Sequence, residues 1–327
     1  MNWKSQSVLV TGAGGFIGSH LAEALVRSGA RTRALVHYNS AGREGWLEHS
    51  EYRSDLDVVA GDIREVDSVI GALKGVDIVF HLAALIAIPY SYRSPSSYVS
   101  TNIVGTLNIL QEALRANVSR VVHTSTSEVY GSAKAIPISE KHPLQGQSPY
   151  SATKIGADKL AESFHRSFGL PVSIVRPFNT YGPRQSARAV IPTIMTQALS
   201  NEPIRIGNTT PTRDFNFVED TVRGFILNAE SEGSVGQVIN LGTGTETSIG
   251  ELARIICSLA GCECHIVQEA QRIRPVDSEV DRLLADNRVA EQVLGWRPEV
   301  RLQDGLKQTM NWVRDNLKSY RPEVYTV

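Results

Sequence analysis

The sequence predicts an α/β fold in which a doubly wound parallel sheet is followed by a smaller C-terminal α/β domain. Strand-like and helix-like segments alternate along the first part of the chain, which favours a parallel sheet with helices on both faces. After about Gly182 the elements become shorter, and Pro, Gly, Thr and Asn become frequent. We therefore expect one domain over residues 1–182 and a second over 183–327, with 213–242 returning to the first.

The elements of the first domain follow from short apolar runs and from helical periodicity. Gly29 ends the first helix as a C-cap, and Ser148 and Pro149 are the N-cap and first residue of the last one. The predicted strands cover residues 7–10, 33–36, 56–59, 78–82, 120–123 and 172–175. The predicted helices cover residues 16–28, 66–73, 97–116 and 149–168.

The second part of the chain carries fewer clear signals. Ser248 and Glu251 are spaced as a capping box, which predicts a helix over 249–260. A further helix is expected over 303–317. An apolar run predicts a strand over 238–242.

Composition excludes several classes of protein. The 327 residues carry 33 Lys and Arg against 34 Asp and Glu, so no overall charge favours nucleic acid or an anionic membrane. Three Cys do not form a disulfide framework. The longest nearly apolar stretch, 78–88, is too short to span a bilayer. We expect a cytoplasmic protein that binds neither nucleic acid nor a membrane.

A glycine-rich turn follows the first predicted strand and opens the first helix. Gly12, Gly15 and Gly18 allow a tight turn, a close approach to a pyrophosphate and close packing of the helix on the sheet. The free N–H groups of the helix N-terminus, at Phe16 and Ile17, would bind that anion. In this strand–turn–helix context, the turn predicts a Rossmann-type dinucleotide site.

Tyr150 and Lys154 lie four residues apart, on one face of a predicted helix. A neighbouring ammonium favours the phenolate and lowers a tyrosine pKa. Such a tyrosine can remove a proton from a hydroxyl while hydride leaves the same carbon. The pair predicts an oxidoreductive step on an alcohol.

The Gly-x-x-Gly-x-x-Gly turn together with Tyr-x-x-x-Lys resembles the extended short-chain dehydrogenase/reductases, the NAD-dependent epimerase/dehydratase family. The resemblance covers essentially the whole chain, and it implies a tightly bound NAD or NADP. The candidate cofactor-binding positions, some implied by the resemblance and some read from the residues after the second strand, are Gly12, Gly15, Phe16, Ile17, Gly18, His37, Asn39, Ser40, Arg43, Asp62, Ile63, Leu82, Ala83, Ala84, Asn102, Tyr150 and Lys154.

The end of the second predicted strand departs from the pattern for NAD. An acidic residue is expected there to bind the adenosine ribose hydroxyls. The sequence instead has His37, Asn39 and Ser40, with Arg43 nearby, and these could bind a 2′-phosphate or form a polar loop. The choice between NAD and NADP stays open.

The segment Ser125–Gly131 resembles the active-site loop of nucleotide-sugar 4,6-dehydratases. By this resemblance Thr126 joins Tyr150 and Lys154, and Ser127 and Glu128 act on sugar carbons 5 and 6. A ketone at C4 acidifies the C5 proton, which Glu128 would remove as the C6 hydroxyl leaves. UDP-glucuronate decarboxylases have a very similar loop, and C4-epimerases usually lack the acid. A non-catalytic NAD(P)-binding regulator is a further alternative. The presence of Thr126, Tyr150 and Lys154 together argues against it.

The same resemblance implies a nucleotide-sugar substrate, held by Asn179, Arg213 and Arg274. Guanidinium groups suit a diphosphate. The stretch 123–197 is most similar to the dehydratases of legionaminic acid and related cell-surface sugar pathways, which favours UDP-N-acetylglucosamine over GDP-N-acetylglucosamine as substrate.

The family commonly dimerises through two helices that correspond to 97–116 and 149–168, so we expect a homodimer. The candidate contacts could equally face the sheet; they are Val104, Leu107, Ala157, Leu160 and Phe164. We predict no metal site, because Cys257, Cys262, Cys264 and His265 lack the spacing of paired zinc ligands.

Overall fold

A computed structural model describes residues 1–320 and confirms the predicted fold class. Residues 321–327 of the predicted second domain lie outside the described part. Seven strands form one sheet in the order β10-β6-β5-β4-β1-β2-β3, and every neighbouring pair is parallel. These strands are β1 Ser7–Thr11, β2 Arg31–His37, β3 Leu56–Gly61, β4 Ile78–His81, β5 Arg120–Thr124, β6 Val172–Pro177 and β10 Val238–Leu241. The strand order reverses between β1 and β4, where ligands of such sheets bind.

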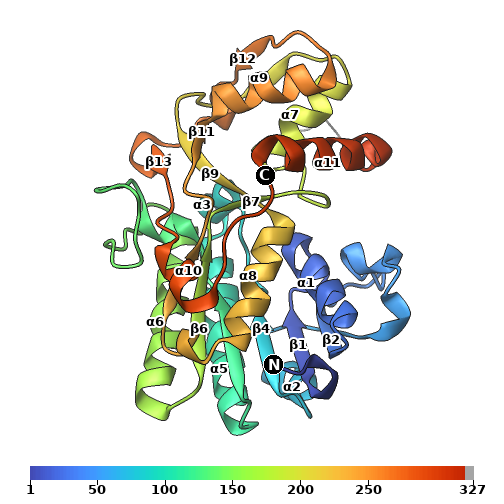
Figure 1. Ribbon diagram of the computed structural model, residues 1–327, viewed down its shortest axis with the longest axis vertical. Helices are drawn as coiled ribbons and strands as arrows, with labels where there is room; N and C mark the ends of the chain where they lie inside the picture. The colour runs from blue at the N-terminus through green and yellow to red at the C-terminus, as the bar shows by residue number, and fades with distance from the viewer. Residues whose placement is uncertain (321–327) are drawn as a thin grey trace.

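Helices cover both faces of this sheet (Figure 1). On one face α1 packs against α8, and on the other α5 packs against α2 and α6. Their bounds are α1 Phe16–Arg27, α2 Val66–Leu73, α5 Gly105–Arg115, α6 Pro149–Phe168 and α8 Val218–Glu230. The Ser148 side chain accepts from the backbone N–H of Ser151 and caps α6 as predicted.

The predicted single helix over 97–116 is divided in the structure. It consists of α4 Pro95–Tyr98, a π-helical turn η4 Val99–Val104, and α5, and α3 Ile88–Arg93 precedes it. The wider turn lies around Asn102, which is fully buried. Such π-helical turns occur frequently at functional sites.

The second part of the chain forms a smaller layer above the large sheet (Figure 1). Its strands are β7 Asn179–Tyr181, β8 Ile204–Ile206, β9 Thr212–Phe217, β11 Glu246–Ser248, β12 Ile266–Gln268 and β13 Arg282–Leu283. Its helices are α7 Val190–Leu199, α9 Ile249–Ala260 and α11 Leu302–Asp315, while α10 Arg288–Leu294 packs beside β10. Short 3₁₀ helices are η1 Trp3–Ser5, η2 Gly45–His49, η3 Arg53–Asp55, η5 Ser127–Tyr130, η6 Glu232–Ser234, η7 Ala270–Arg272, η8 Val276–Ser278 and η9 Leu317–Ser319.

The chain returns to the large sheet later than predicted. Residues 212–217 form β9, which pairs with β7, β11 and β13 of the smaller sheet. The return begins with α8 and ends with β10, which pairs with β6. The domain boundary at 182 stays a prediction.

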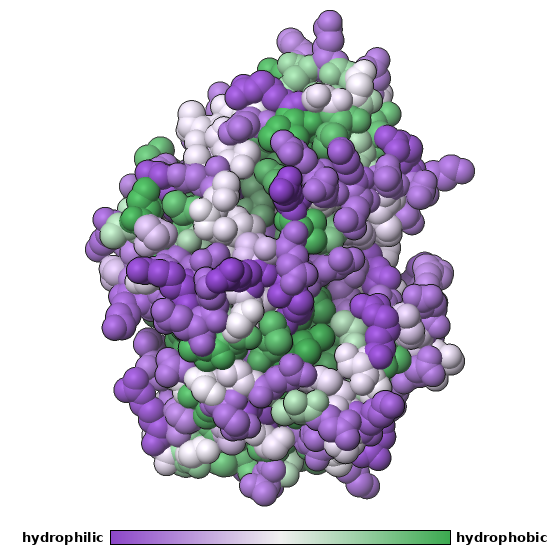
Figure 2. All heavy atoms as spheres, viewed as in Figure 1, coloured by the Kyte–Doolittle hydropathy of each residue, from purple (hydrophilic) through white to green (hydrophobic). Residues whose placement is uncertain are grey.

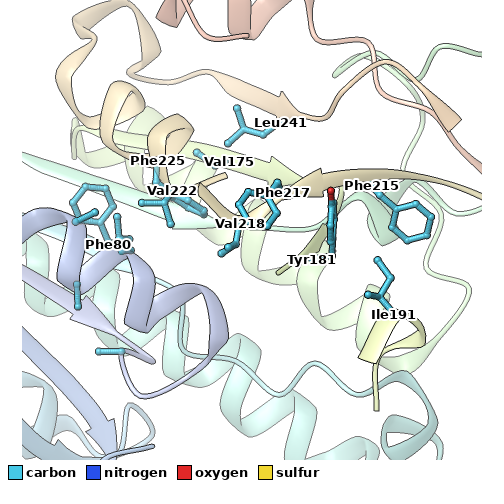
Figure 3. Close-up of a cluster of buried hydrophobic side chains, with 14 of the residues drawn as sticks. Phe80, Val175, Tyr181, Ile191, Phe215, Phe217, Val218, Val222, Phe225 and Leu241 are labelled. Carbon is cyan, nitrogen blue, oxygen red and sulfur yellow. The ribbon is translucent and has the colours of Figure 1, made fainter. Parts of the chain in front are cut away.

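One hydrophobic core runs through both layers. Figure 3 shows Phe80 and Val175 of the large sheet in the same cluster as Phe215 and Ile191 of the smaller layer. Burial of a shared apolar core holds the two layers together. On the face drawn in Figure 2, hydrophilic side chains cover most of the surface, and hydrophobic residues show in groups between them.

Two of the predicted dimer contacts face the protein interior. Ala157 is fully buried and Phe164 is 7% exposed, because α6 packs this side against the sheet and α5. Val104 is 42% exposed, and Leu107 and Leu160 are half-buried. The homodimer stays a prediction that rests on these three. Over residues 1–320, no helix has the length and apolar character needed to cross a membrane.

Candidate active site

The glycine-rich turn has the geometry that a pyrophosphate requires. Gly12 has a φ of +70°, and a Cβ there would lie 2.9 Å from the backbone of Ala83. A Cβ at Gly18 would lie 2.2 Å from the carbonyl oxygen of Gly12. Gly15 caps α1 without a side-chain hydrogen bond, so Phe16 and Ile17 open the helix with uncapped N–H groups. The turn fits the phosphates of NAD(P).

The segment after β4 is held against this turn. The backbone N–H groups of Leu82 and Ala83 both donate to Thr11 Oγ1 at 3.1 Å. Asn102 accepts from the N–H of Leu85 at 2.8 Å and donates to its carbonyl at 2.9 Å. The segment with Ala84 is therefore fixed from both sides, and Asn102 acts as a support.

Asn102 also connects this segment to α6. Its Nδ2 lies 3.1 Å from Thr153 Oγ1, and Thr153 donates in turn to the carbonyl of Tyr150 at 2.7 Å. The fully buried amide of Asn102 therefore has hydrogen-bond partners both in the segment after β4 and in α6.

The residues after β2 and β3 that are predicted to bind adenosine include charged groups near the protein surface. Arg64 forms a bidentate pair with Asp62, and this hydrogen bond lowers the pKa of the Asp62 carboxyl. His37 Nδ1 lies 3.8 Å from Asp62 and is largely exposed. Ile63 is buried against Gly105 of α5, so its side chain belongs to the core.

The loop after β2 is closed by one amide side chain. Asn39 Oδ1 accepts from the N–H of Arg43 at 2.9 Å, and its Nδ2 donates to the Arg43 carbonyl at 2.8 Å. Ser40 is exposed, and the Arg43 guanidinium is 73% exposed and 3.8 Å from Glu48. Asn39 thus shapes the loop, while the Ser40 and Arg43 side chains are exposed at its surface.

The exit of β5 and the start of α6 bring the predicted catalytic groups together. Tyr150 hydrogen-bonds with Thr126, and the Lys154 ammonium donates to the carbonyl of Thr124 at 2.7 Å. Glu128 follows within η5, where its N–H donates to Thr126 Oγ1 at 3.2 Å. Ser127 is buried in the same turn. One short loop and one helix face therefore carry the whole predicted set.

Burial dominates the protonation of this pair. Burial raises the pKa of the Tyr150 phenol well above its usual value, and the Thr126 hydrogen bond only partly opposes it. This is opposite to the lowering expected from Lys154, because the ring lies in an apolar cluster with Leu85, Ile88 and Tyr98. Burial also lowers the pKa of Lys154 to about 8.

The two predicted substrate arginines lie beside Glu128. Arg274 Nη1 is 3.8 Å from Glu128 and 3.9 Å from Glu279, and Arg213 Nη2 is 3.4 Å from Glu279. Burial lowers the pKa of Arg213, which Glu128 and Glu279 oppose. Arg274 Nη1 is buried and has no hydrogen-bond partner within residues 1–320. These donors suit an incoming anion.

Asn179 lies at the start of β7, where it pairs in register with Phe215 of β9. Its Oδ1 is buried, and the described residues offer it no hydrogen-bond partner. Buried amide oxygens are normally satisfied, so this atom is available to a ligand.

Three residues of the site escaped sequence reasoning. Glu279 lies between the two arginines, and Tyr98 packs edge-on against Tyr150 at 6.3 Å between ring centroids. Asp158 follows Lys154 by one helical turn in α6, is 1% exposed, and its charge acts on Lys154. Only Asp158 carried a signal, because its spacing of four from Lys154 places both on one helix face. In the described part, no cluster of three His, Cys, Asp or Glu could hold a metal ion, and the three cysteines are free.

The profile of the family described as GDP-mannose 4,6 dehydratase matches residues 9–309. The chain belongs to this family. The UDP-glucose 4-epimerase of Mycolicibacterium smegmatis is 35% identical over 94% of this chain and 98% of its own length. The dTDP-glucose 4,6-dehydratase of Streptomyces antibioticus is 33% identical over 97% of this chain and 95% of its own.

A solved structure gives the same result. The dTDP-glucose 4,6-dehydratase of Streptomyces venezuelae, crystallised with NAD, is 34% identical with a TM-score of 0.86, over 97% of this chain and 99% of that one. The expected family and its NAD(P) dependence are confirmed. Dehydratases and epimerases both occur among these relatives, so they do not single out a reaction or an N-acetylglucosamine-specific subgroup.

Proposed function

We propose that this protein is a nucleotide-sugar 4,6-dehydratase, a lyase that removes water from UDP-N-acetylglucosamine. The observation that carries the proposal is the carboxylate of Glu128 in the same turn as Thr126, which hydrogen-bonds Tyr150. Plain epimerisation at C4 requires no such acid. A carboxylate at this point supplies a base for the C5 proton.

The residues divide the chemistry between two carbons. NAD(P), when bound, supplies the hydride acceptor for C4 and the hydride donor for C6. Tyr150 takes the proton of the C4 hydroxyl, and Thr126 holds the phenol in place by its hydrogen bond. The ammonium of Lys154 and the positive charge of the bound oxidised nicotinamide would favour the phenolate form that takes this proton, and so oppose the effect of burial on the phenol.

Glu128 acts on the next bond of the sugar. Its carboxylate takes the C5 proton, which the C4 carbonyl has acidified, and returns it to the C6 hydroxyl as that group leaves as water. Ser127, in the same turn, lies on the C6 side in this scheme. As C6 is reduced, the proton that Tyr150 took from the C4 hydroxyl is returned to C5, so the net change is the loss of one water with the cofactor restored.

The diphosphate of the substrate is assigned to Arg213 and Arg274. Arg213 is 6% exposed, and its Nη1 is fixed on the carbonyl of Thr212 at 2.9 Å. Asn179 has a free buried oxygen for a sugar hydroxyl. The sequence resemblance over 123–197 favours UDP-N-acetylglucosamine, with GDP-N-acetylglucosamine second.

Product mass tests the proposal directly. The purified protein is incubated with UDP-N-acetylglucosamine, GDP-N-acetylglucosamine, UDP-glucose, dTDP-glucose and UDP-glucuronate, and each product is weighed by mass spectrometry. Loss of one water from an N-acetylglucosamine nucleotide is expected. Loss of carbon dioxide from the uronate would identify a decarboxylase. An unchanged mass with inverted C4 would identify an epimerase, and no turnover would favour a regulator.

The protein is also proposed to act in the cytoplasm as a homodimer. The exposed Val104 at the end of η4, with the half-buried Leu107 of α5 and Leu160 of α6, supports this arrangement. Light scattering should give twice the chain mass, and substitution of Val104 by Glu should lower it. A monomeric mass for the unchanged protein would refute the dimer.

A further inference from the structure

Three side chains on one face of α6 bind three consecutive residues at the exit of β5. Tyr150 hydrogen-bonds Thr126, and Lys154 donates to the Thr124 carbonyl at 2.7 Å. The third contact comes from Asp158, which accepts from the hydroxyl of Ser125 at 2.8 Å. The spacing of four residues makes this a continuous stripe along the helix. Each residue that leads into the catalytic turn is thus tied to α6.

Asp158 is the anchor at the buried end of this stripe. It is 1% exposed, and its Oδ2 also accepts from Arg176 of β6 at 2.8 and 3.2 Å. His123 of β5 lies 3.3 Å from its Oδ1. Burial alone would raise the pKa of Asp158, but the hydrogen bond with His123 and the charge of Arg176 bring it to about 2. These contacts therefore favour the carboxylate form of Asp158 despite its burial.

We propose that Asp158 is a positioning residue of the active site. It holds Ser125, and through it the turn that carries Thr126 and Glu128, and it supplies the buried negative charge that keeps the Lys154 ammonium protonated. The kinetic part of this proposal rests on the proposed dehydratase function, whereas the titration of Lys154 does not.

Lys154, Asp158 and the β5 exit form the buried floor of the site. Among the groups of this floor, Asp158 supplies the negative charge that acts on Lys154. His81 of β4 and His123 of β5 are fully buried, and burial lowers the pKa of both, which favours their neutral forms. The Arg176 guanidinium of β6 forms an ion pair with Asp158 at 2.8 Å. On the open side Glu128 faces Tyr150 and Arg274. The Lys154 pKa, lowered by burial to about 8, is raised by Asp158 alone among the charges that act on it.

The test is a titration of Lys154 in the cofactor-bound protein. Nitrogen-15 lysine NMR, assigned with Lys154→Met, reports its protonation without any substrate. Asp158→Asn should lower the Lys154 pKa by about one unit, since a nearby opposite charge moves a pKa by about that much or more. The alkaline limb of the rate should move to lower pH by the same amount.

Matched variants separate charge from packing. Asp158→Glu keeps the charge and should keep the Lys154 titration, although it alters the packing. Ser125→Ala keeps the charge but removes one contact, and it should lower kcat with KM and the titration unchanged. Glu162→Gln removes a partly exposed carboxylate of the same helix, which pairs with Lys159 and Arg166, and it should change neither.

Two outcomes would overturn the role of Asp158. One is a Lys154 titration that stays in place in Asp158→Asn, and the other is a kcat that is untouched by Ser125→Ala. If Asp158→Asn does not fold because Arg176 is left buried without its partner, Asp158→Asn/Arg176→Met removes both charges and is titrated instead. A protein without dehydratase activity would still give the NMR result, so failure of the proposed function is recognised separately.

Discussion

The floor of the site and its arginine cluster are built differently. At the floor, the contacts of Lys154 and Asp158 with the β5 exit are 2.7 and 2.8 Å long. In the cluster, Arg213 and Arg274 lie 3.4 to 3.9 Å from Glu128 and Glu279. The floor joins elements of one sheet layer, whereas the cluster joins both layers.

This difference indicates a division of labour. Short buried bonds fix the groups that are proposed to move protons, because misplacement at a reacting bond is costly. Longer ion pairs leave the guanidinium groups available to an anion, because an incoming diphosphate offers a shorter, charge-assisted contact. Substitutions in the floor should therefore affect kcat, and substitutions in the cluster should affect KM.

The largest effect is expected from Tyr150→Phe. Loss of the phenol removes the base for the C4 hydroxyl, so kcat should fall by about 10²–10⁴-fold, the usual contribution of a general base. Rates are followed by product mass, with cofactor content and circular dichroism as checks on folding. Tyr90→Phe removes an exposed phenol whose ring packs on Tyr98 rather than on Tyr150, and it should keep most of the activity. A comparable loss of kcat in both variants would show that the phenol of Tyr150 has no special role.

Glu128→Gln should stop the reaction after the first step. The amide cannot take the C5 proton, so water loss should fall by about 10²-fold or more while C4 oxidation continues. Reduced cofactor should therefore accumulate on the protein, which its ultraviolet absorbance reports. If oxidation and water loss disappear together, Glu128 acts before the C5 step.

Arg274→Gln should act mainly on binding. A hydrogen bond to a charged group contributes about 1.5–3 kcal/mol, so KM should rise by about tenfold to hundredfold with a smaller change in kcat. Arg205→Gln alters an exposed arginine of the smaller layer and should leave KM unchanged. A fall in kcat without a rise in KM would show that Arg274 acts on catalysis through Glu128 and not on substrate binding.

The smallest effect is expected at the adenosine end. Arg43→Ala removes an exposed cation, and exposed pairs contribute about 0.2–1 kcal/mol, so NADP affinity should drop by at most about fivefold. Isothermal titration of the cofactor-free protein with NAD and NADP measures it. Equal changes for both cofactors would show that Arg43 does not contact a 2′-phosphate.

Most of the fold could be predicted from local patterns. The Gly12 turn, the strand–helix alternation and the capped helix α6 depend on residues close in sequence, and all appear in the structure. The division of 97–116 by a π-helical turn carried no local signal. The outward or inward orientation of Ala157 and Phe164 also depends on which neighbour α6 meets.

The sequence by itself determined the parallel sheet and the glycine turn, because short-range patterns encode them. The spacing of Tyr150 and Lys154, and a family resemblance for Thr126, marked these three as candidate catalytic residues. Only the tertiary structure decided that burial raises the Tyr150 pKa, that Glu279 lies between the two arginines, and that Asp158 anchors the β5 exit. Desolvation and contacts between distant segments depend on the assembled core, and no local pattern along the chain records them.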